Sequence, residues 1–398
     1  MNRIVILGNG FDIAHGLLTG YRDFIKYLRN EFVDFVNACS HEQISKLHPL
    51  FYFTSAEAIL INGTEPQFFA FKHNEEVIKS WEELCARVSI RYNGNDVCNA
   101  QVSFRNLLLG YVFTSSSSTT WGGFENDYKD VLTRIMQGKP NSANGIIPKN
   151  YTAKNLNDDL KQIVELLYRY LKDQITIPKT LDKKILSKLL SKPIRKSRMD
   201  SKHVPRYGEI SIINHHEEPD NLENVLFLSF NYTATIQNYL FKSENFNAID
   251  NCNLDYNSSN RITTSLRYIH GDLDDGSSDS LIFGYGDELD ESQAILERSG
   301  DEFLKHIKSV LYTRSPYYRE VIDFADAGHF DIVIYGHSCS NTDRTLLNAL
   351  FEHENCISIQ PYLYDLSDTS IYMNIYRCFK DKQLMRRRVV DQTSTIRG

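Results

Sequence analysis

Hydrophobic residues form two patterns along the chain. The first is a short, largely apolar run that ends in Gly, Asn, His, Ser or Asp. Uninterrupted apolar runs of this length are typical of strands buried on both faces of a parallel sheet. The predicted strands are Ile4–Leu7, Val225–Phe230, Leu266–Ile269, Leu281–Phe283, Phe330–Tyr335 and Ile357–Ile359.

The second pattern places apolar residues three or four positions apart, which predicts amphipathic helices. The segment Tyr21–Ala38 shows it well, because its phenylalanines and leucine recur at helical spacing. Pro316 interrupts one of the later helices. The other predicted helices are Val77–Ile90, Gln101–Val112, Trp121–Met136, Asn155–Ile175, Ala234–Phe241 and Phe303–Phe324.

Strands that alternate with helices predict an α/β fold with a parallel sheet. The strands lie at the start of the chain and again after Asn224. We therefore expect a Rossmann-like nucleotide-binding domain made of residues 1–20 and 221–398. Residues 21–220 are expected to form a large, mostly helical inserted domain.

The turn after the first strand reads Gly8-Asn9-Gly10, and Asp12 follows in the first turn of a helix. A strand, a glycine turn and a helix start commonly hold a phosphate, because free N–H groups and the helix dipole point at one spot. The third glycine of a G-x-G-x-x-G motif is absent, since Ile13 stands there. A tight turn that binds no ligand is the alternative interpretation.

Polar residues also follow the later strands. Ligands of open α/β sheets bind outside the carboxyl ends of the strands, so these residues are expected to converge on one crevice. The expected nucleotide contacts are Gly8, Asn9, Gly10, Asp12, Gly284, Gly286, Gly336 and Ser338.

Two of the strand-end residues are candidates for catalysis. His270, which precedes a glycine, can titrate near neutral pH and act as a general base. Asn231 can donate and accept hydrogen bonds together, so it can hold a water molecule or a ribose hydroxyl. A structural histidine and a turn asparagine are the alternatives. No G-x-S-x-G motif surrounds Ser338, which argues against a serine hydrolase.

The composition is that of a globular protein, with 41% hydrophobic and 24% charged residues among 398. No apolar run reaches about 18 residues, so we expect no membrane span, and no signal peptide is evident. The seven cysteines are scattered without a C-x-x-C pair. We therefore expect a cytoplasmic protein without a metal site or a disulfide framework.

The net charge of −7 gives no overall attraction to nucleic acid. Residues 183–206 are locally basic, however, and could bind nucleic acid or an acidic partner. No aromatic residues interleave the basic ones, so a solvated surface loop is the favoured interpretation. Arg386, Arg387 and Arg388 are expected to belong to a charged tail.

Several motifs together resemble the bacteriophage abortive infection family AbiH. They occur in order from the first turn to Asp343 and span nearly the whole chain. They are Gly8 to Leu17, Trp121 to Glu125, Phe230-Asn231-Tyr232-Thr233, Ile269-His270-Gly271, Phe283 to Asp287, and Tyr335-Gly336-His337-Ser338 through Asp343.

That family is similar in turn to the sirtuin-like fold of antiviral NAD hydrolases. The resemblance implies that Gly8, Gly10, Gly336 and Ser338 bind the nucleotide, while Asn231 and His270 flank the nicotinamide ribose. NAD would be the substrate and its nicotinamide–ribose bond would be cleaved. The alternatives are a non-catalytic nucleotide sensor or toxin and a nucleic-acid-binding defence protein. Whether a phage component triggers the protein, and whether the chain forms a homo-oligomer, stay open.

Overall fold

A computed structural model describes most of the chain, and it contains two compact units. These are residues 1–19 with 164–398, and residues 20–163. Their limits differ from those of the expected domains, which stay a prediction. The described residues are 1–38, 48–55, 77–87, 89–92, 96–114, 119–140, 147–178, 181–190, 222–241, 262–274, 276–286, 293–363, 365, 367 and 369–390.

The first unit contains a five-stranded parallel sheet with the strand order β6-β5-β1-β7-β8. The chain runs outward from β1 through β5 to β6 and then returns to the other side of β1 for β7 and β8. The strand order therefore reverses beside β1. The strands are β1 (Asn2–Leu7), β5 (Asn224–Ser229), β6 (Thr263–Tyr268), β7 (Phe330–Tyr335) and β8 (Cys356–Tyr362).

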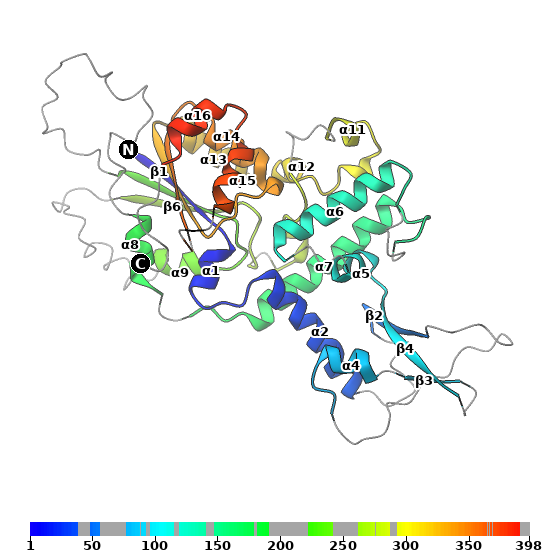
Figure 1. The fold of residues 1–398 in the computed structure, drawn as a ribbon. Helices are drawn as coiled ribbons and strands as arrows, with labels where there is room; N and C mark the ends of the chain where they lie inside the picture. Colours follow the sequence, from blue (N-terminus) through cyan, green and yellow to red (C-terminus); the bar gives the residue numbers. More distant parts are fainter. Residues whose placement is uncertain are drawn as a thin grey trace, which may run out of the picture. The chain divides into compact units, whose positions relative to one another are not determined.

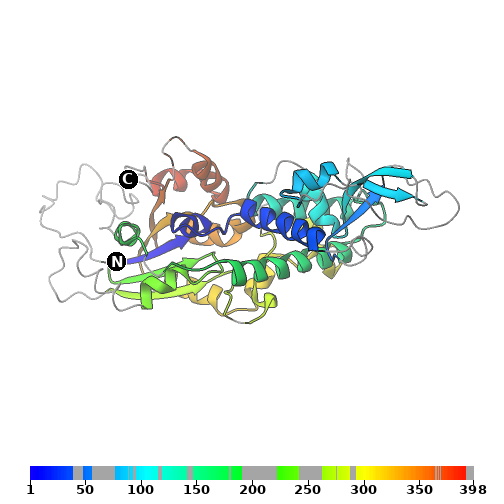
Figure 2. The ribbon, with the colours of Figure 1, turned by 90° about the horizontal axis from the view of Figure 1, so that it is seen from below.

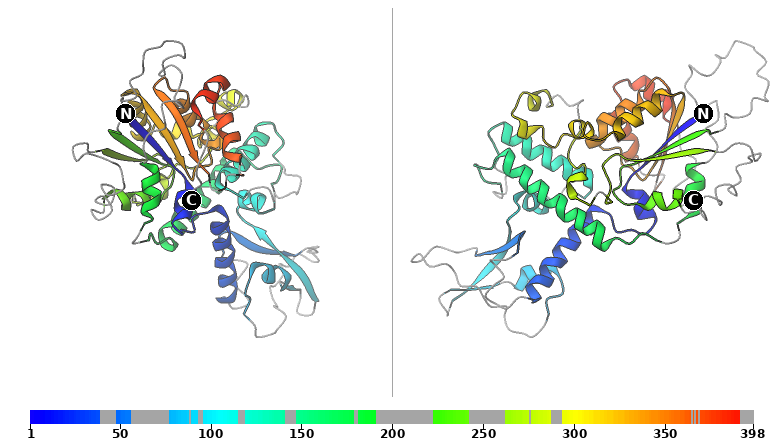
Figure 3. Two further views of the ribbon diagram at one scale, coloured as in Figure 1. Left: turned by 60° about the vertical axis from the view of Figure 1, so that its left-hand side comes forward. Right: turned by 180° about the vertical axis from the view of Figure 1, so that it is seen from behind.

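Helices cover both faces of this sheet (Figure 1; Figure 3, left). One face packs against α13 (Tyr317–Asp326), α14 (Arg344–Phe351) and α15 (Ser370–Cys378). The other packs against α1 (Asn9–Ala14), α8 (Lys183–Leu189) and α9 (Thr235–Phe241). The mixed α/β class and the parallel sheet are thus confirmed.

Alternate residues of β1 supply the two cores. Ile4 and Ile6 face α13 to α15, whereas Val5 and Leu7 face α1, α8 and α9, and all four are completely buried. Side chains that alternate along a strand point to opposite faces. Because both faces are apolar, this strand reads as a continuous hydrophobic run in the sequence.

The second unit combines helices with a small antiparallel sheet of order β2-β4-β3. The ring of Phe32 in α2 contacts those of Phe51 in β2 and Trp81 in α4, and Figure 2 shows α2 (blue) beside α4 (cyan). The elements are α2 (Tyr21–Ala38), β2 (Phe51–Ser55), α4 (Trp81–Arg87), β3 (Ser89–Tyr92), β4 (Asp96–Phe104), α5 (Leu107–Thr114) and α6 (Trp121–Met136); α7 (Ala153–Gln174) crosses into the first unit.

Three predicted elements are wrong. The expected helix Val77–Ile90 is a shorter helix, α4, followed by β3, and the expected helix Gln101–Val112 begins as strand β4. Gln101-Val102-Ser103-Phe104 alternates polar and apolar residues, a strand signal that the helical interpretation overlooked. Leu281–Phe283 is not a strand, and Tyr285 forms only an isolated bridge with Ile307.

The structure describes the two basic segments, residues 183–206 and 386–388, to different extents. Lys183 and Lys184 begin α8 and are exposed, while residues 191–206 lie outside the described residues, so their binding of nucleic acid stays a prediction. Arg388 is not part of a charged tail. It ends α16 (Lys382–Arg388), is buried, and donates to the carbonyl of Phe351. Among the described residues, no helix has the length and apolarity needed to cross a bilayer.

Candidate functional site

The glycine turn after β1 packs closely against the turn after β7. A Cβ on Gly8 would lie 2.5 Å from Cα of His337, and one on Gly10 would lie 2.7 Å from Cα of Gly336. Gly336 itself has φ of +70°, which favours glycine. These glycines therefore allow the two strand-end turns to touch where the strand order reverses.

The same contact uses the N–H groups that were expected to face a phosphate. The amide of Gly8 donates to the carbonyl of Tyr335 at 3.1 Å, and the amide of Gly10 donates to that of Gly336 at 2.8 Å. Because both N–H groups already donate to backbone carbonyls, they are not free to bind a phosphate as expected. Binding of a nucleotide at this edge stays a proposal.

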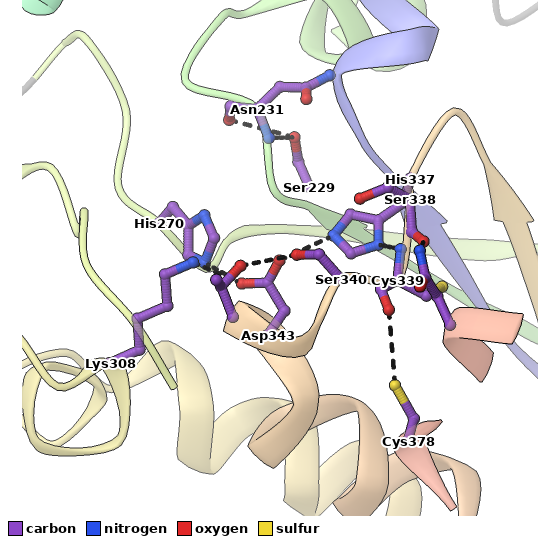
Figure 4. Close-up of polar contacts among 12 residues, drawn as sticks. Ser229, Asn231, His270, Lys308, His337, Ser338, Cys339, Ser340, Asp343 and Cys378 are labelled. Carbon is purple, nitrogen blue, oxygen red and sulfur yellow. Dashed lines mark hydrogen bonds and ion pairs between the residues drawn. The ribbon is translucent and has the colours of Figure 1, made fainter. Parts of the chain in front are cut away.

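Asn231 follows β5 and is tied to the glycine turn. Its Nδ2 donates to the carbonyl of Gly8 at 3.0 Å, and its backbone N–H donates to Oγ of Ser229 at 3.2 Å. The side chain is buried at the junction of β1 and β5 (Figure 4). The structure thus brings Asn231 together with the Gly8-Gly10 turn, as the sequence predicted.

Asp12 lies beneath the same turn as a buried carboxyl group. Its Oδ2 accepts a hydrogen bond of 2.6 Å from Oγ1 of Thr233, whereas its Oδ1 makes no hydrogen bond within the described residues. Burial raises the pKa of Asp12 to about 6, although the bonds from Thr233 and Thr235 oppose that rise. An unpaired buried oxygen is costly, and a ligand hydroxyl could satisfy it.

This carboxyl group predicts a pH dependence of stability. The folded-state pKa of about 6 exceeds the ordinary value of 3.8, so the folded chain keeps a proton that the unfolded chain loses. The free energy of unfolding should therefore fall by roughly 2–3 kcal/mol as the pH rises from about 4 to above 6. Urea unfolding of the wild type and of Asp12→Asn across this range isolates the effect. A constant difference between the two proteins would contradict it.

His270 follows β6 and is held by the turn after it. Gly271 has φ of +82°, and a Cβ there would lie 2.3 Å from the carbonyl oxygen of Ser280. The histidine carbonyl accepts the amide of Ile282 at 2.8 Å. Burial, with the nearby charge of Lys308, lowers the pKa of His270 to about 4. The expectation that it titrates near neutral pH is therefore wrong, and the ring is neutral at pH 7.

A buried carboxylate lies at the centre of the cluster around His270 (Figure 4). Oδ1 of Asp343 is 2.7 Å from Nζ of Lys308 and 3.3 Å from Nε2 of His270, and Oδ2 is 3.4 Å from Nε2 of His337. Burial alone would raise the pKa of Asp343. The charge of Lys308 and hydrogen bonds from both histidines instead hold that pKa well below the usual range of a carboxyl.

Gly284 and Gly286 place Lys308 in this cluster. A Cβ on Gly284 would lie 2.1 Å from the carbonyl oxygen of His306, and one on Gly286 would lie 3.1 Å from Cβ of Lys308. Tyr285 between them exchanges backbone hydrogen bonds with His306 and Lys308. The two glycines therefore support the start of α12 (Lys308–Tyr312), a role distinct from the expected nucleotide contact.

The two remaining predicted contacts lie at the edges of the site. Oδ1 of Asn9 accepts a hydrogen bond of 2.5 Å from Thr19, which ties the start of α1 to the chain that follows it. Ser338 is exposed, and its carbonyl accepts a hydrogen bond from Asn374. The ligand contact predicted for Ser338 stays a prediction.

Sequence reasoning missed the importance of three members of the cluster: Lys308, Tyr312 and Asp343. The hydroxyl of Tyr312 lies 3.2 Å from Nε2 of His270. Asp343 does follow a strand, in the short helix η4 (Asn341–Asp343) that leads into α14, and this position could have been noticed. Lys308 and Tyr312 follow no strand, so the strand-end rule could not find them.

Other places on the described surface offer less chemistry. A hollow of about 390 Å³ lies beside the outer strand β6, lined partly by Gln237, Arg267 and Tyr317. Arg267 is already paired with Glu320 there. Within the described ranges, no three His, Cys, Asp or Glu side chains are grouped so that they could hold a metal ion.

The site thus joins two sets of groups at the carboxyl end of the sheet. One is the glycine turn with Asn231 and Asp12, and the other is the cluster centred on Asp343. The two sets meet where the Gly8 turn packs against the backbone of His337. The ring of Phe230, the residue before Asn231, packs on both histidines of the second set, with ring centroids 5.1 Å from His270 and 4.2 Å from His337. This arrangement can bind polar groups through Asn231 and accept a proton on a neutral imidazole.

Comparison with known proteins agrees with the resemblance in the sequence. No similar sequence was found among curated proteins. The family model described as "Bacteriophage abortive infection AbiH" matches residues 4–364, a range that includes the glycine turn, Asn231, His270 and Asp343. The chain therefore belongs to the AbiH family, and this membership implies a role in abortive infection as a defence against phage.

Proposed function

We propose that the chain binds an NAD-type dinucleotide at the carboxyl end of its parallel sheet and hydrolyses the bond between nicotinamide and ribose. Loss of NAD in an infected cell would stop growth and so limit the phage. The observation that carries this proposal is the placement of Asn231 and His270 after the neighbouring parallel strands β5 and β6, with Asn231 bonded to the turn after β1.

The sheet supports a Rossmann-like, sirtuin-like assignment. The order β6-β5-β1-β7-β8 corresponds to the order 3-2-1-4-5 of dinucleotide-binding sheets, in which the ligand lies where the strand order reverses. In this chain the turns after β1 and β7 meet at that point. Oδ1 of Asp12, which has no hydrogen-bond partner in the part of the chain that the structure describes, fits a ribose hydroxyl, whereas the Gly8 and Gly10 amides are engaged by Tyr335 and Gly336.

The proposed reaction needs no group beyond the nucleotide and water. The bond between the anomeric carbon and the nicotinamide nitrogen breaks, and nicotinamide leaves with the bonding electrons as a neutral molecule. The oxygen of water bonds to the anomeric carbon, and one of its protons passes to His270. Asn231 holds the water and the ribose hydroxyls, and the transition state has oxocarbenium character, as in other glycosidic cleavages.

Burial of both candidate catalytic residues favours a second candidate function, a nucleotide sensor that binds without turnover. Both candidates predict NAD binding, and only the first predicts nicotinamide release. The assay uses the full chain, purified from uninfected and from phage-infected cells, incubated with NAD and analysed for nicotinamide and ADP-ribose. Tight binding without either product would support the sensor. Absence of both binding and turnover in both preparations would overturn the proposal.

A further inference from the structure

We propose that Asp343 is the positioning residue of this site. It holds His270 in the tautomer with the proton on Nε2, which leaves Nδ1 as the proton acceptor, and Lys308 balances its charge. The inference rests on the proposed function in one respect, namely that the proton accepted by Nδ1 comes from the reaction with NAD. The arrangement of the side chains stands on the geometry alone.

Both oxygens of Asp343 are engaged by groups from different parts of the first unit. Lys308 comes from α12, His270 from the turn after β6, and His337 from the turn after β7. The exposed fractions of the side chains are 1% for Lys308 and 8% for Asp343. A buried ion pair of this kind is costly to assemble, so we assign it a role beyond stability.

The tautomer of His337 follows from its two contacts. Its Nδ1 accepts the backbone N–H of Cys339 at 3.0 Å, so the ring proton must lie on Nε2, which faces Oδ2 of Asp343. Cys339 has φ of 53°, a conformation uncommon outside glycine. The surrounding structure therefore holds the Cys339 backbone in this conformation, and its N–H sets the tautomer of His337.

The tautomer of His270 follows from the same carboxylate. Its Nε2 lies 3.3 Å from Oδ1 of Asp343 and 3.2 Å from the hydroxyl of Tyr312. A lone pair on Nε2 would be repelled by the carboxylate oxygen, so Nε2 carries the proton. Figure 4 shows the other ring nitrogen of His270 turned away from Asp343. Nδ1 is then the nitrogen that can accept a proton from a bound molecule.

Lys308 and Asp343 act on His270 in opposite directions. The carboxylate favours the imidazolium form, whereas the ammonium of Lys308 disfavours it and adds to the effect of burial. His270 is therefore neutral at pH 7, ready to accept a proton, with a carboxylate beside it to stabilise the imidazolium that forms. The titratable and charged groups that face it are Lys308, Tyr312, His337 and Asp343, with the rings of Phe230 and Tyr232 packed beside it.

The test is NMR of the full chain labelled with ¹⁵N-histidine, which reports tautomer and protonation without any turnover. His270 is assigned by its loss in His270→Gln. We expect the wild type to show His270 protonated on Nε2 and uncharged above pH 5. In Lys308→Met the protonation of His270 should move to higher pH by about one unit or more, since an opposing charge is removed.

Two matched variants sharpen the result. Lys305→Met removes an exposed lysine from the same segment and should leave the His270 titration unchanged. Lys308→Arg keeps the charge and should preserve the wild-type behaviour. In Asp343→Asn the preference for a proton on Nε2 should be lost. Wild-type spectra with the proton of His270 on Nδ1 would overturn the inference even if the Lys308 and Asp343 variants do not fold.

The outcome separates this inference from the proposed function. The expected spectra without NAD turnover would leave Asp343 as a positioning residue and remove the hydrolase. If instead the chain turns over NAD, the acid limb of the pH–rate profile should move to higher pH in Lys308→Met. Turnover with an unchanged profile in Lys308→Met and an unchanged tautomer of His270 in Asp343→Asn would contradict the positioning role while the hydrolase stands.

Discussion

Nicotinamide release is expected to fall by about 100-fold or more when His270 is replaced with alanine. General-base catalysis by a positioned side chain contributes roughly 10²–10⁴-fold, and the variant removes the only proton acceptor assigned to the reaction. The neutral state of His270 at pH 7 is the form that this role requires. Initial rates with saturating NAD give the comparison. Asn231→Ala, measured in parallel, should show a loss of similar size.

A histidine at the opposite end of the sheet provides the control. His353 packs on Phe330 at the start of β7 and pairs with Asp326, so it lies at the amino end of that strand. His353→Ala should release nicotinamide at the wild-type rate. Equal rates for His270→Ala, Asn231→Ala and the wild type would remove the catalytic roles assigned here.

The parts of the site that could be predicted from the sequence are those attached to strand ends. The run Val225–Phe230 predicts a buried strand, and a parallel sheet places its end beside that of β1, so Asn231 was expected near Gly8. The bond from Asn231 to the Gly8 carbonyl agrees with that reasoning. In this case the local hydrophobic pattern and the parallel topology of the sheet predict the same position for Asn231.

The glycines were harder to interpret because one residue type serves different purposes. Glycine permits the close approach of a ligand and equally the close approach of another segment. In this chain Gly8, Gly10 and Gly336 approach one another, and Gly284 and Gly286 approach His306 and Lys308. No property of the local sequence distinguishes the two uses, since the partner segment is hundreds of residues away or follows no regular pattern.

The protonation of His270 also lay beyond sequence reasoning. A histidine before a glycine has an ordinary pKa near neutrality, and only its burial and the charge of Lys308 bring that value to about 4. Lys308 reaches Asp343 because the segment around Tyr285 pairs with the start of α12. Such a contact depends on tertiary packing, which a periodic pattern does not report.

Removing Arg3 is expected to destabilise the fold by about 3–5 kcal/mol, because it leaves a buried carboxylate without its partner. Arg3 and Asp331 are register partners on β1 and β7, and the guanidinium donates two hydrogen bonds to the carboxylate, of 2.8 and 2.6 Å. A third donor of Arg3 bonds the carbonyl of Leu189, which ties α8 to the sheet. The side chains are 1% and 0% exposed, so water cannot compensate the loss.

Urea unfolding of Arg3→Met measures this cost, and the double variant Arg3→Met with Asp331→Leu provides the matched comparison. An apolar pair of similar volume can replace a buried ion pair at little cost, so the double variant should recover much of the lost stability. A double variant as unstable as Arg3→Met would mean that the bond to Leu189 dominates. A single variant as stable as the wild type would contradict the role of the pair. The strand β1, on which the turn of the candidate site depends, would then be held by its pairing with β5 and β7 and by its apolar neighbours.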